Sequence, residues 1–598
     1  MEKNVVILDI DYVTYEDKPV IRLFSKEGDK NVVLLDDTFK PYLYVIPEDS
    51  LEECQKQILD NLDNVSIQKV IKKDFQIEKT FLKLTFLNPQ DLAKNRDNLR
   101  DLNQVAHIRE YDIPFYRRYL IDRNVVPMTE VKACGEKVDS FLNLDSKKHD
   151  LEIIKLTKPL ECVREDLQDF RILSFDLEVR NPHGMPNSEV DEIIMIGVAS
   201  NFGINQVIST KTNSEDRDDF VNQVSSEKEM IETFIDIVKK NNVDIIVGYN
   251  SDNFDFPYLK DRAKIYGLDL DLGMDDSNIK FIRRGYANSA SFKGLIHVDL
   301  YLVMRRYMTL ERYTLERVYY ELFGEEKIDV PGEHIWEYWD SDSTPLDDLF
   351  DYSLDDVIAT LKIAQQTLPL NLELTRIVGQ PLFDLSRMAT GQQAEWFLVK
   401  EAYFDNEVVP NKPGGANFAI RAAEEDNEGG YVKEPEIGLH ENLVQFDFRS
   451  LYPSIIISKN ISPDVLVIGD VENKDDYNIS PEHGLKFKKS QKGFIPSVIS
   501  KILAERFKIK KAMKASNNLT EKKTLDVQQQ AIKRLANTMY GIYGFPRFRW
   551  YSYECAKAIT SWGRQYIKKA MKKAEDYGFY AIYADTDGFY AKYKKEEK

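Results

Sequence analysis

Two acidic residues, Asp585 and Asp587, stand one position apart within the stretch Ala581–Tyr590. Aromatic and aliphatic residues flank them and Gly588 follows directly, a pattern that predicts a strand, a tight turn and a second strand. Two carboxylates at the tip of a hairpin repel each other unless a divalent cation binds there or water surrounds them. Taken alone, the pattern Asp-x-Asp-Gly is more often a solvated turn than a metal site.

A third acidic residue, Asp447, opens the run Asp-Phe-Arg-Ser-Leu-Tyr-Pro-Ser at residues 447–454, where a predicted buried strand turns into a helix. This run resembles motif A of family B DNA polymerases, and Tyr583–Asp587 resembles motif C of the same family. The resemblance implies that Asp447, Asp585 and Asp587 are catalytic and bind two Mg²⁺ ions, with Mn²⁺ as an alternative. Asp447 and Asp587 would contact the metal directly. The implied reaction joins a dNTP to the 3′-hydroxyl of a primer.

The same resemblance assigns the residues after Asp447 to the incoming nucleotide. Backbone amides at a turn between a strand and a helix can receive phosphate oxygens, and a tyrosine beneath the sugar would exclude a 2′-hydroxyl. A tyrosine in this place can equally be structural. The implied nucleotide-binding residues of motif A are Phe448, Arg449, Ser450, Leu451 and Tyr452.

Apolar residues recur with helical spacing over Val498–Lys514, and a polar turn at residues 516–518 leads to a second predicted helix. On that helix, Lys533, Asn537 and Tyr540 recur four and three positions apart and therefore share one face. Lysines on helices usually just solvate a surface, but this spacing resembles motif B of the fingers, which close over a triphosphate. The residues of the helical pair implied for triphosphate binding are Arg506, Lys510, Lys533, Asn537 and Tyr540.

Three further acidic motifs occur earlier in the chain. Asp-x-Glu lies at the end of the buried run Ile172–Leu177, Asn-x-x-x-Phe-Asp follows the run Asp244–Tyr249, and Tyr-x-x-x-Asp lies on a helix predicted over Asp348–Gln366. Any one of these acids is more often a solvated carboxylate or a helix cap than a metal ligand. In this order and spacing, however, they resemble the three motifs of DnaQ-like 3′→5′ proofreading exonucleases.

This second resemblance implies a hydrolytic site with two metal ions, because hard divalent ions prefer carboxylate oxygens and can activate water. Tyr352 would orient the attacking water, and Asn250 and Phe254 would hold the departing nucleotide. The implied catalytic and metal-binding carboxylates are Asp176, Glu178, Asp255 and Asp356, with Asp176 shared by both ions.

Residues 1–125 alternate short β-rich runs with a helix predicted over Leu51–Leu62, which indicates a small α+β domain. This region resembles the N-terminal domain of archaeal family B polymerases, whose pocket senses uracil in the template strand. Ordinary core packing of prolines and aromatic residues explains the matching positions equally well. Those positions are Tyr12, Pro41, Tyr42, Pro89, Leu92, Ile113, Phe115 and Arg118, and Leu92 stands where the family has a smaller valine.

The motifs together predict a multidomain chain of α/β and α+β units with an antiparallel palm sheet and helical-hairpin fingers. Asn427 replaces the tyrosine of the family's Tyr-x-Gly-Gly motif, which puts the partition of primer between two sites in doubt. Residues 126–165 are polar and lysine-rich, and we expect an irregular connector there. The expected boundaries are 1–165 for the N-terminal domain with its connector, 166–367 for an RNase H-like exonuclease domain, 368–410 for a return to the N-terminal domain, 411–492 and 543–598 for the palm, and 493–542 for the fingers.

The composition excludes several classes of protein. No run approaches the roughly 18 apolar residues of a membrane span, and the 4 cysteines and 7 histidines are scattered without a zinc or disulfide pattern. A reducing cytoplasm is therefore expected. The 81 basic and 100 acidic residues leave a net charge of −19, which argues mildly against a nucleic-acid partner, although binding depends on local basic stripes.

Family B polymerases continue beyond the catalytic hairpin into a thumb that grips duplex DNA, whereas this sequence ends in the polar run Lys594–Lys598. We therefore expect the large subunit of a split, two-polypeptide archaeal enzyme. It would bind primer–template DNA and dNTP, take its thumb from a second polypeptide and reach a sliding clamp through that partner. A thumb supplies most phosphate contacts, so the acidic net charge fits this expectation. A truncated chain is the other explanation.

Two rival functions are a stand-alone nuclease with a degenerate polymerase half and a non-catalytic DNA-binding scaffold. Erosion of the acidic motifs would favour either rival. Asp447, Lys533 and Asp587 are all intact, and so are the nuclease motifs. The sequence therefore favours an enzyme with two separate sites over both rivals.

Overall fold

The computed structural model describes residues 1–164, 169–213, 220–284, 287–341, 344–424 and 428–593. Its internal contacts divide the chain into two compact units. The first unit comprises Met1–Phe39 and Pro114–Ala389, and the second comprises Lys40–Ile113 and Thr390–Lys598. Within the described ranges, no helix is long and apolar enough to cross a lipid bilayer. The polar run at 594–598 lies outside the described residues.

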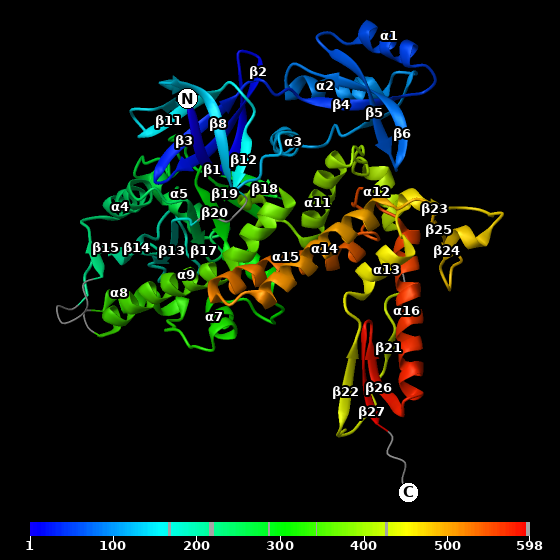
Figure 1. Cartoon of the computed structure of the whole chain (residues 1–598). Helices are drawn as coiled ribbons and strands as arrows, with labels where there is room; N and C mark the ends of the chain where they lie inside the picture. Colours follow the sequence, from blue (N-terminus) through cyan, green and yellow to red (C-terminus); the bar gives the residue numbers. More distant parts are fainter. Residues whose placement is uncertain (165–168, 214–219, 285–286, 342–343, 425–427, 594–598) are drawn as a thin grey trace. The chain divides into compact units, whose positions relative to one another are not determined.

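The first unit contains a six-stranded sheet of order β1-β2-β3-β11-β8-β12 (Figure 1). Residues 126–165, expected as an irregular connector, instead supply the last three of these strands, so that prediction is wrong. Val131 and Ala133 alternate with polar residues along β8, and both pack in the core of the sheet with Ile154 of β11. The strands are β1 Glu2–Tyr15, β2 Lys18–Glu27, β3 Lys30–Asp36, β8 Glu130–Val138, β11 Leu151–Leu156 and β12 Glu161–Arg164.

A second six-stranded sheet of the first unit has the order β16-β15-β14-β13-β17-β20. Phe175 of β13 packs on one face against Phe234 of α4 and Phe256 of α5, while Ser174 on the other face donates a hydrogen bond to the Val357 carbonyl of α9 at 2.7 Å. The sheet is thus enclosed by helices on both faces. Its elements are β13 Ile172–Val179, β14 Ile193–Ser200, β15 Asn205–Ser209, β16 Val221–Gln223, β17 Ile245–Gly248, β20 Ile296–Asp299, α4 Glu227–Lys240, α5 Asp255–Ile265 and α9 Thr344–Val378.

Short elements complete the first unit. Two small hairpins are formed by β9 with β10 and by β18 with β19. The bounds are α3 Phe115–Asp122, β9 Ser140–Phe141, β10 Leu144–Asp145, β18 Lys280–Arg284, β19 Ala287–Ser291, α6 Leu300–Tyr307, α7 Leu315–Phe323, the 3₁₀ turn Gly332–His334, α8 Ile335–Asp340 and α10 Leu382–Leu385.

The second unit contains a four-stranded antiparallel sheet of order β5-β6-β4-β7, which shares its core with α1 and α2. The strands predicted for one N-terminal domain over residues 1–125 therefore form two sheets that belong to different units. Val408 packs against Tyr42 and Phe81 of this sheet, so the chain returns to it after α11. The elements are β4 Tyr42–Pro47, α1 Leu51–Asn61, β5 Ser66–Asp74, β6 Ile77–Thr85, α2 Pro89–Arg100, β7 Val105–Arg109 and α11 Thr390–Phe404.

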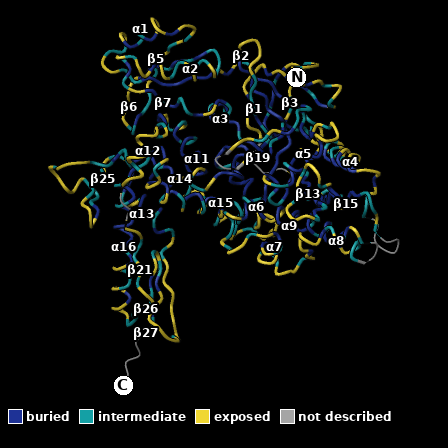
Figure 2. The backbone as a smooth tube through the Cα atoms, turned by 180° about the vertical axis from the view of Figure 1, so that it is seen from behind, coloured by how far each residue is buried: buried dark blue, intermediate teal, exposed yellow. Residues whose placement is uncertain are grey.

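A second antiparallel sheet of the same unit has the order β21-β26-β27-β22. Helix α16 covers one face, where Ile567 and Ala574 pack with Ala581 and Phe589. The edge strand β22 is exposed along its whole length (Figure 2). The elements are β21 Val432–Lys433, β22 Leu443–Asp447, α13 Leu451–Lys459, α16 Tyr553–Glu575, β26 Phe579–Asp585 and β27 Gly588–Tyr593.

The predicted helical hairpin forms as α14 and α15, joined by residues 516–518 (Figure 1). Arg506 of α14 donates a hydrogen bond to the Gln529 side chain of α15 at 3.0 Å, which ties the two helices together. Helix α12 and a three-stranded sheet of order β23-β25-β24 complete the unit. The bounds are α12 Gly415–Ala422, β23 Leu466–Val467, β24 Tyr477–Ile479, β25 Lys486–Lys488, α14 Phe494–Ala515, α15 Leu519–Gly541 and the 3₁₀ turns Pro463–Val465 and Lys474–Asp476.

Candidate active sites

Carboxylates from three elements gather at the second sheet of the first unit. Strand β13 carries Asp176 and Glu178, helix α5 begins at Asp255, and helix α9 carries Asp356. One oxygen from each of Asp176, Glu178 and Asp356 lies within 4.8 Å of the other two. The charge of Asp255 acts on Asp176 from nearby. The four acids that the sequence motifs predicted are thus brought together.

Burial raises the pKa of all four carboxyl groups, and neighbouring carboxylates raise those of Asp176 and Glu178 further. The pKa of Asp255 rises to about 7 and that of Asp356 to about 6, mainly through burial. Among the described residues, Glu178 Oε1 and Asp255 Oδ1 are buried oxygens without a hydrogen-bond partner. Divalent cations would balance the charge and use these oxygens, so the residues present fit the predicted metal ions.

Helix α9 can approach these acids because a glycine faces it from β14. Gly197 pairs with Asp176 across the sheet, and a Cβ atom at Gly197 would lie 2.9 Å from the Ser353 carbonyl of α9. Tyr352 lies one helical turn before Asp356 on the same face of α9, and its hydroxyl lowers the pKa of Asp356 in part. Burial raises the pKa of Tyr352, so its hydroxyl keeps its proton and can donate.

Lys327 is a member of this site that the sequence reasoning missed. Its side chain is completely buried and forms an ion pair with Asp356. The Nζ atom also lies 4.7 Å from the centre of the Tyr352 ring. No periodicity or motif singled out this residue, which follows α7 in a charged loop where a lysine is normally exposed. One buried cation therefore offsets part of the charge of the carboxylates.

We expect Lys327→Met to lower 3′→5′ hydrolysis about 10²-fold, the usual cost of removing one electrostatic contact from a catalytic site. The physical reason is that Asp356 and Tyr352 lose the cation that fixes them. Release of nucleotides from labelled single-stranded DNA measures the effect. Lys228→Met is the matched control, because Lys228 forms only a surface ion pair with Glu232. Unchanged digestion by a folded Lys327→Met variant would refute this role.

The two residues predicted to hold the departing nucleotide lie at the start of α5. The side chain of Asn250 accepts a hydrogen bond from Asn253 at 2.9 Å, and its backbone amide donates to Asp299 at 2.9 Å. The ring of Phe254 is half-buried, 5.5 Å from that of Tyr258. Asn250 is thus engaged in a local turn, and nucleotide binding by these two residues stays a prediction.

The second acidic site lies at one end of the palm sheet formed by β21, β26, β27 and β22. Asp447 at the end of β22 and Asp585 at the end of β26 both pair with Gly588 of β27. Asp587 stands in the turn between β26 and β27, and burial together with the charges of Asp447 and Asp585 raises its pKa. The hairpin predicted from the Asp-Gly pattern is therefore present, and its register places the three acids side by side. Repelling carboxylates on exposed strand ends fit divalent cations.

The backbone amide of Phe448 is not open to a phosphate group, contrary to the expectation from motif A. It donates a hydrogen bond to the carbonyl of Asp587 at 2.8 Å, and the Phe448 ring packs beside the core under α16. This bond joins the end of β22 to the acidic turn, so the amide is already hydrogen-bonded within the protein and cannot also donate to a nucleotide. Ser450 adopts a left-handed conformation, with φ of 52°, where β22 passes into α13.

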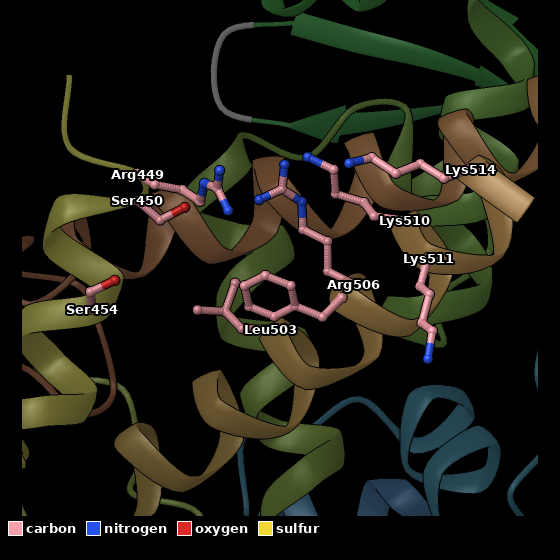
Figure 3. Close-up of a pocket in the computed structure, with 9 residues that line it drawn as sticks. Arg449, Ser450, Ser454, Leu503, Arg506, Lys510, Lys511 and Lys514 are labelled. Atoms are coloured by element: carbon pink, nitrogen blue, oxygen red, sulfur yellow. The ribbon is translucent and has the colours of Figure 1, made fainter. Parts of the chain in front are cut away.

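A cationic cavity of about 380 Å³ lies between α13 and α14, and its lining includes Arg449, two residues after Asp447 (Figure 3). The charged ends of Arg449, Arg506, Lys510 and Lys514 point toward one another across it, whereas Lys511 points away. The remaining lining residues are Ser450, Ser454, Leu503, Phe507 and Lys511. The sequence predicted Arg449, Ser450, Arg506 and Lys510 for this role and missed the others.

These cations repel one another. Arg506 and then burial lower the pKa of Lys510, with further contributions from Arg449, Lys514 and Lys533. In the part of the chain that the structure describes, no carboxylate pairs with Arg449, Arg506 or Lys510. A cluster of cations without counter-ions suits a polyanion such as a triphosphate. Lys533 and Asn537 are exposed on α15 and do not line the cavity itself.

Tyr452 of α13 stacks on Tyr540 of α15, with ring centres 4.1 Å apart and an angle of 30° between the planes. Its other side lies against α16, where a Cβ atom at Gly563 would come within 3.0 Å of the Tyr452 ring. The side chain of Leu451 is buried in the palm. Tyr452 is therefore held in a fixed position between α15 and α16.

The positions predicted to line a template-uracil pocket divide between the two units. In the first unit, Tyr12 and Phe115 are in edge-to-face contact at 5.1 Å, and Arg118 is buried. In the second unit, Leu92 packs in the core of the small sheet. The other positions in the second unit are Pro41, Tyr42, Pro89 and Ile113. The pocket stays a prediction, and Asn427 lies outside the described residues.

Comparison with known proteins agrees with this pair of sites. The family model for DNA polymerase family B matches residues 386–597, and that for the exonuclease domain of DNA polymerase family B matches residues 106–318. A DNA polymerase of Thermococcus gorgonarius is 41% identical over 595 residues, which cover 98% of this chain and 71% of that protein. DNA polymerase 1 of Pyrococcus abyssi is 40% identical over 592 residues, again 98% and 71% of the two chains.

The solved structure of the family B DNA polymerase from the hyperthermophilic archaeon Pyrobaculum calidifontis superposes with a TM-score of 0.84 at 29% identity. The match covers 99% of this chain and 75% of that one. The fold and the acidic sites define a DNA polymerase with an exonuclease domain. The chain belongs to family B of the DNA polymerases, and its relatives are archaeal. It catalyses DNA-directed DNA synthesis on primer–template DNA with dNTP substrates.

Proposed function

We propose that synthesis follows a two-metal phosphoryl transfer at Asp447, Asp585 and Asp587. The observation that carries this proposal is the register of β22, β26 and β27, which brings three carboxylates together. One of them, Asp447, lies two residues before Arg449, a lining residue of the cationic cavity. Two Mg²⁺ ions held there would activate the primer hydroxyl and neutralise charge on the phosphates. The chain itself supplies the anchoring carboxylates and the strand ends that fix them.

The cationic cavity would bind the triphosphate of the incoming nucleotide. Arg449, Arg506 and Lys510 lack carboxylate partners within the described residues, and Arg449 follows Asp447 by two residues. Phosphate binding would relieve their mutual repulsion, so it would also draw α14 toward the palm. Tyr452, braced by Tyr540, would stand beneath the sugar and exclude ribonucleotides.

Proofreading would take place separately in the first unit. Asp176, Glu178, Asp255 and Asp356 would hold two divalent ions, with Tyr352 positioning the attacking water through its hydroxyl. Supporting observations are the buried, unpartnered carboxylate oxygens and the protonated tyrosine beside them. No residue is shared with the palm site, so the two activities are separable by mutation.

Primer extension with Mg²⁺ and dNTP tests the two-site proposal as a whole. A labelled primer–template should be extended with all four dNTPs and shortened from its 3′ end without them. Omission of divalent ions should stop both reactions. Shortening without any extension, under conditions in which the native enzyme is fully assembled, would support the stand-alone nuclease instead.

A further inference from the structure

A buried arginine on α16 connects two segments that lie far apart in the sequence. The Arg564 side chain is 3% exposed, and its Nη1 atom donates hydrogen bonds to the carbonyls of Glu428 and Gly429, each at 2.6 Å. Its Nε atom lies 3.1 Å from both carboxylate oxygens of Glu482, and Nη2 also donates to that carboxylate. The guanidinium thus binds two segments. One is the glycine loop at residues 428–431, and the other is the turn that carries Glu482 before β25.

The glycine loop also contacts the acidic turn of the palm, residues 585–587. A Cβ atom at Gly430 would lie 2.6 Å from the Thr586 hydroxyl, so the loop touches the residue between Asp585 and Asp587. The carbonyl of Tyr431 accepts a hydrogen bond from the Thr586 amide at 2.9 Å. Thr586 itself is in the left-handed region, with φ of 53°. A non-glycine residue in that conformation needs its surroundings to hold it there.

We propose that Arg564 is a positioning residue for DNA synthesis: it fixes the Glu428–Tyr431 loop, which in turn fixes Thr586 and the two aspartates beside it. The inference rests on the proposed role of Asp585 and Asp587. Arg564 touches neither acid, so its effect passes through two backbone segments. The chain of contacts lies entirely within the second unit.

The choice of arginine follows from the geometry. One planar guanidinium serves a carboxylate and two carbonyls at once, in different directions, and keeps its charge while buried. A lysine has a single ammonium group and reaches only part of this set. The Glu482 carboxylate in turn offsets the buried charge, and the arginine holds the pKa of Glu482 below its usual range. Losing the arginine therefore frees the loop, whereas losing only the carboxylate charge leaves the carbonyl contacts.

Hydrogen exchange on the full chain without metal measures the proposed effect directly. Arg564→Ala should speed exchange of the amides at 579–590 several-fold, because the Thr586 amide loses its fixed acceptor. Exchange in the first unit should not change. In primer extension, kcat should fall about 10- to 100-fold, the scale of a small misplacement of reacting groups. The KM for dNTP should stay within about twofold, since the cationic cavity is untouched.

Three further variants keep the test informative. Arg564→Lys should recover part of the loss, and Glu482→Gln should show a smaller loss than Arg564→Ala. Gly430→Ala would push Thr586 away from the loop and so disturb the same contact that Arg564→Ala loosens. The losses of kcat in the two variants should therefore not add. Lys572→Ala, an exposed residue of the same helix, is the control and should behave as the unchanged chain. Faster exchange throughout the second unit, or additive effects of the two variants, would overturn the proposal.

The design separates this inference from the proposed function. If Asp587→Ala abolishes synthesis while Arg564→Ala alters neither exchange at 579–590 nor kcat, the inference fails and the palm site stands. If Asp587→Ala retains synthesis, the palm assignment fails, even where Arg564→Ala loosens the turn. Exonuclease activity of every variant, which depends on the first unit, reports whether the preparation is folded.

Discussion

Replacing Asp447 or Asp587 by alanine should abolish primer extension, with a loss of at least about 10³-fold, and leave digestion of single-stranded DNA intact. A loss of that size corresponds to roughly 4 kcal/mol of transition-state stabilisation. The cause is specific: these carboxylates anchor the proposed metal ions on the palm sheet, and the nuclease acids lie in the other unit. Gel analysis of a labelled primer measures both reactions on the same substrate.

Asp470→Ala is the matched control for the palm variants, because Asp470 is an exposed acid of the same unit. It should extend primers as the unchanged chain does. A folded Asp447→Ala or Asp587→Ala variant that loses both activities would show that the two sites are not independent. A variant that still extends primers would show that the palm acids are misassigned.

Asp176→Ala should remove 3′→5′ hydrolysis, also by about 10³-fold or more, and spare synthesis. Asp176 faces Glu178 and Asp356 within metal-binding distance, so its loss removes the ligand shared by both proposed ions. Digestion of a primer with a mismatched 3′ end is the measurement. Asp236→Ala, which removes only a surface ion pair with Lys240, is the control. Substantial digestion of the mismatch by Asp176→Ala would contradict the assignment.

The sequence predicted which acidic residues lie together, because part of their arrangement is encoded locally. Asp176 and Glu178 are two residues apart on one strand, and Tyr352 and Asp356 are one turn apart on one helix. The members of each pair therefore lie on the same face of their element. The Asp-Gly pattern likewise predicted the β26–β27 hairpin. Bringing these local pieces together depends on the register between strands, which the motifs implied only through family resemblance.

Residues that act across long sequence distances were missed. Lys327 reaches Asp356 from a loop outside every motif, and Arg564 binds carbonyls 135 and 136 positions away. A buried cation cannot be told from a surface cation by composition, because lysine and arginine are usually exposed. The Phe448 amide was misassigned for a related reason. Which backbone groups remain open follows from strand pairing, and that pairing was not known from the sequence.

The strands between residues 130 and 164 show the limit of polarity patterns. Their frequent lysines hid a period-two alternation, in which Val131 and Ala133 face the core while Lys132 between them faces the other side. A strand that is polar on one face resembles a loop when only its mean polarity is considered. The domain boundaries drawn from that reading remain predictions.

One time course tests the central claim, that two independent sites act on a single primer end. The enzyme, assembled with its native partners, is given a labelled primer–template with a mismatched 3′ end and all four dNTPs. We predict that Asp587→Ala only shortens the primer, that Asp176→Ala does not shorten it, and that mixing the two variants restores shortening followed by extension. Loss of both reactions in either single variant, or no recovery on mixing, would contradict the account.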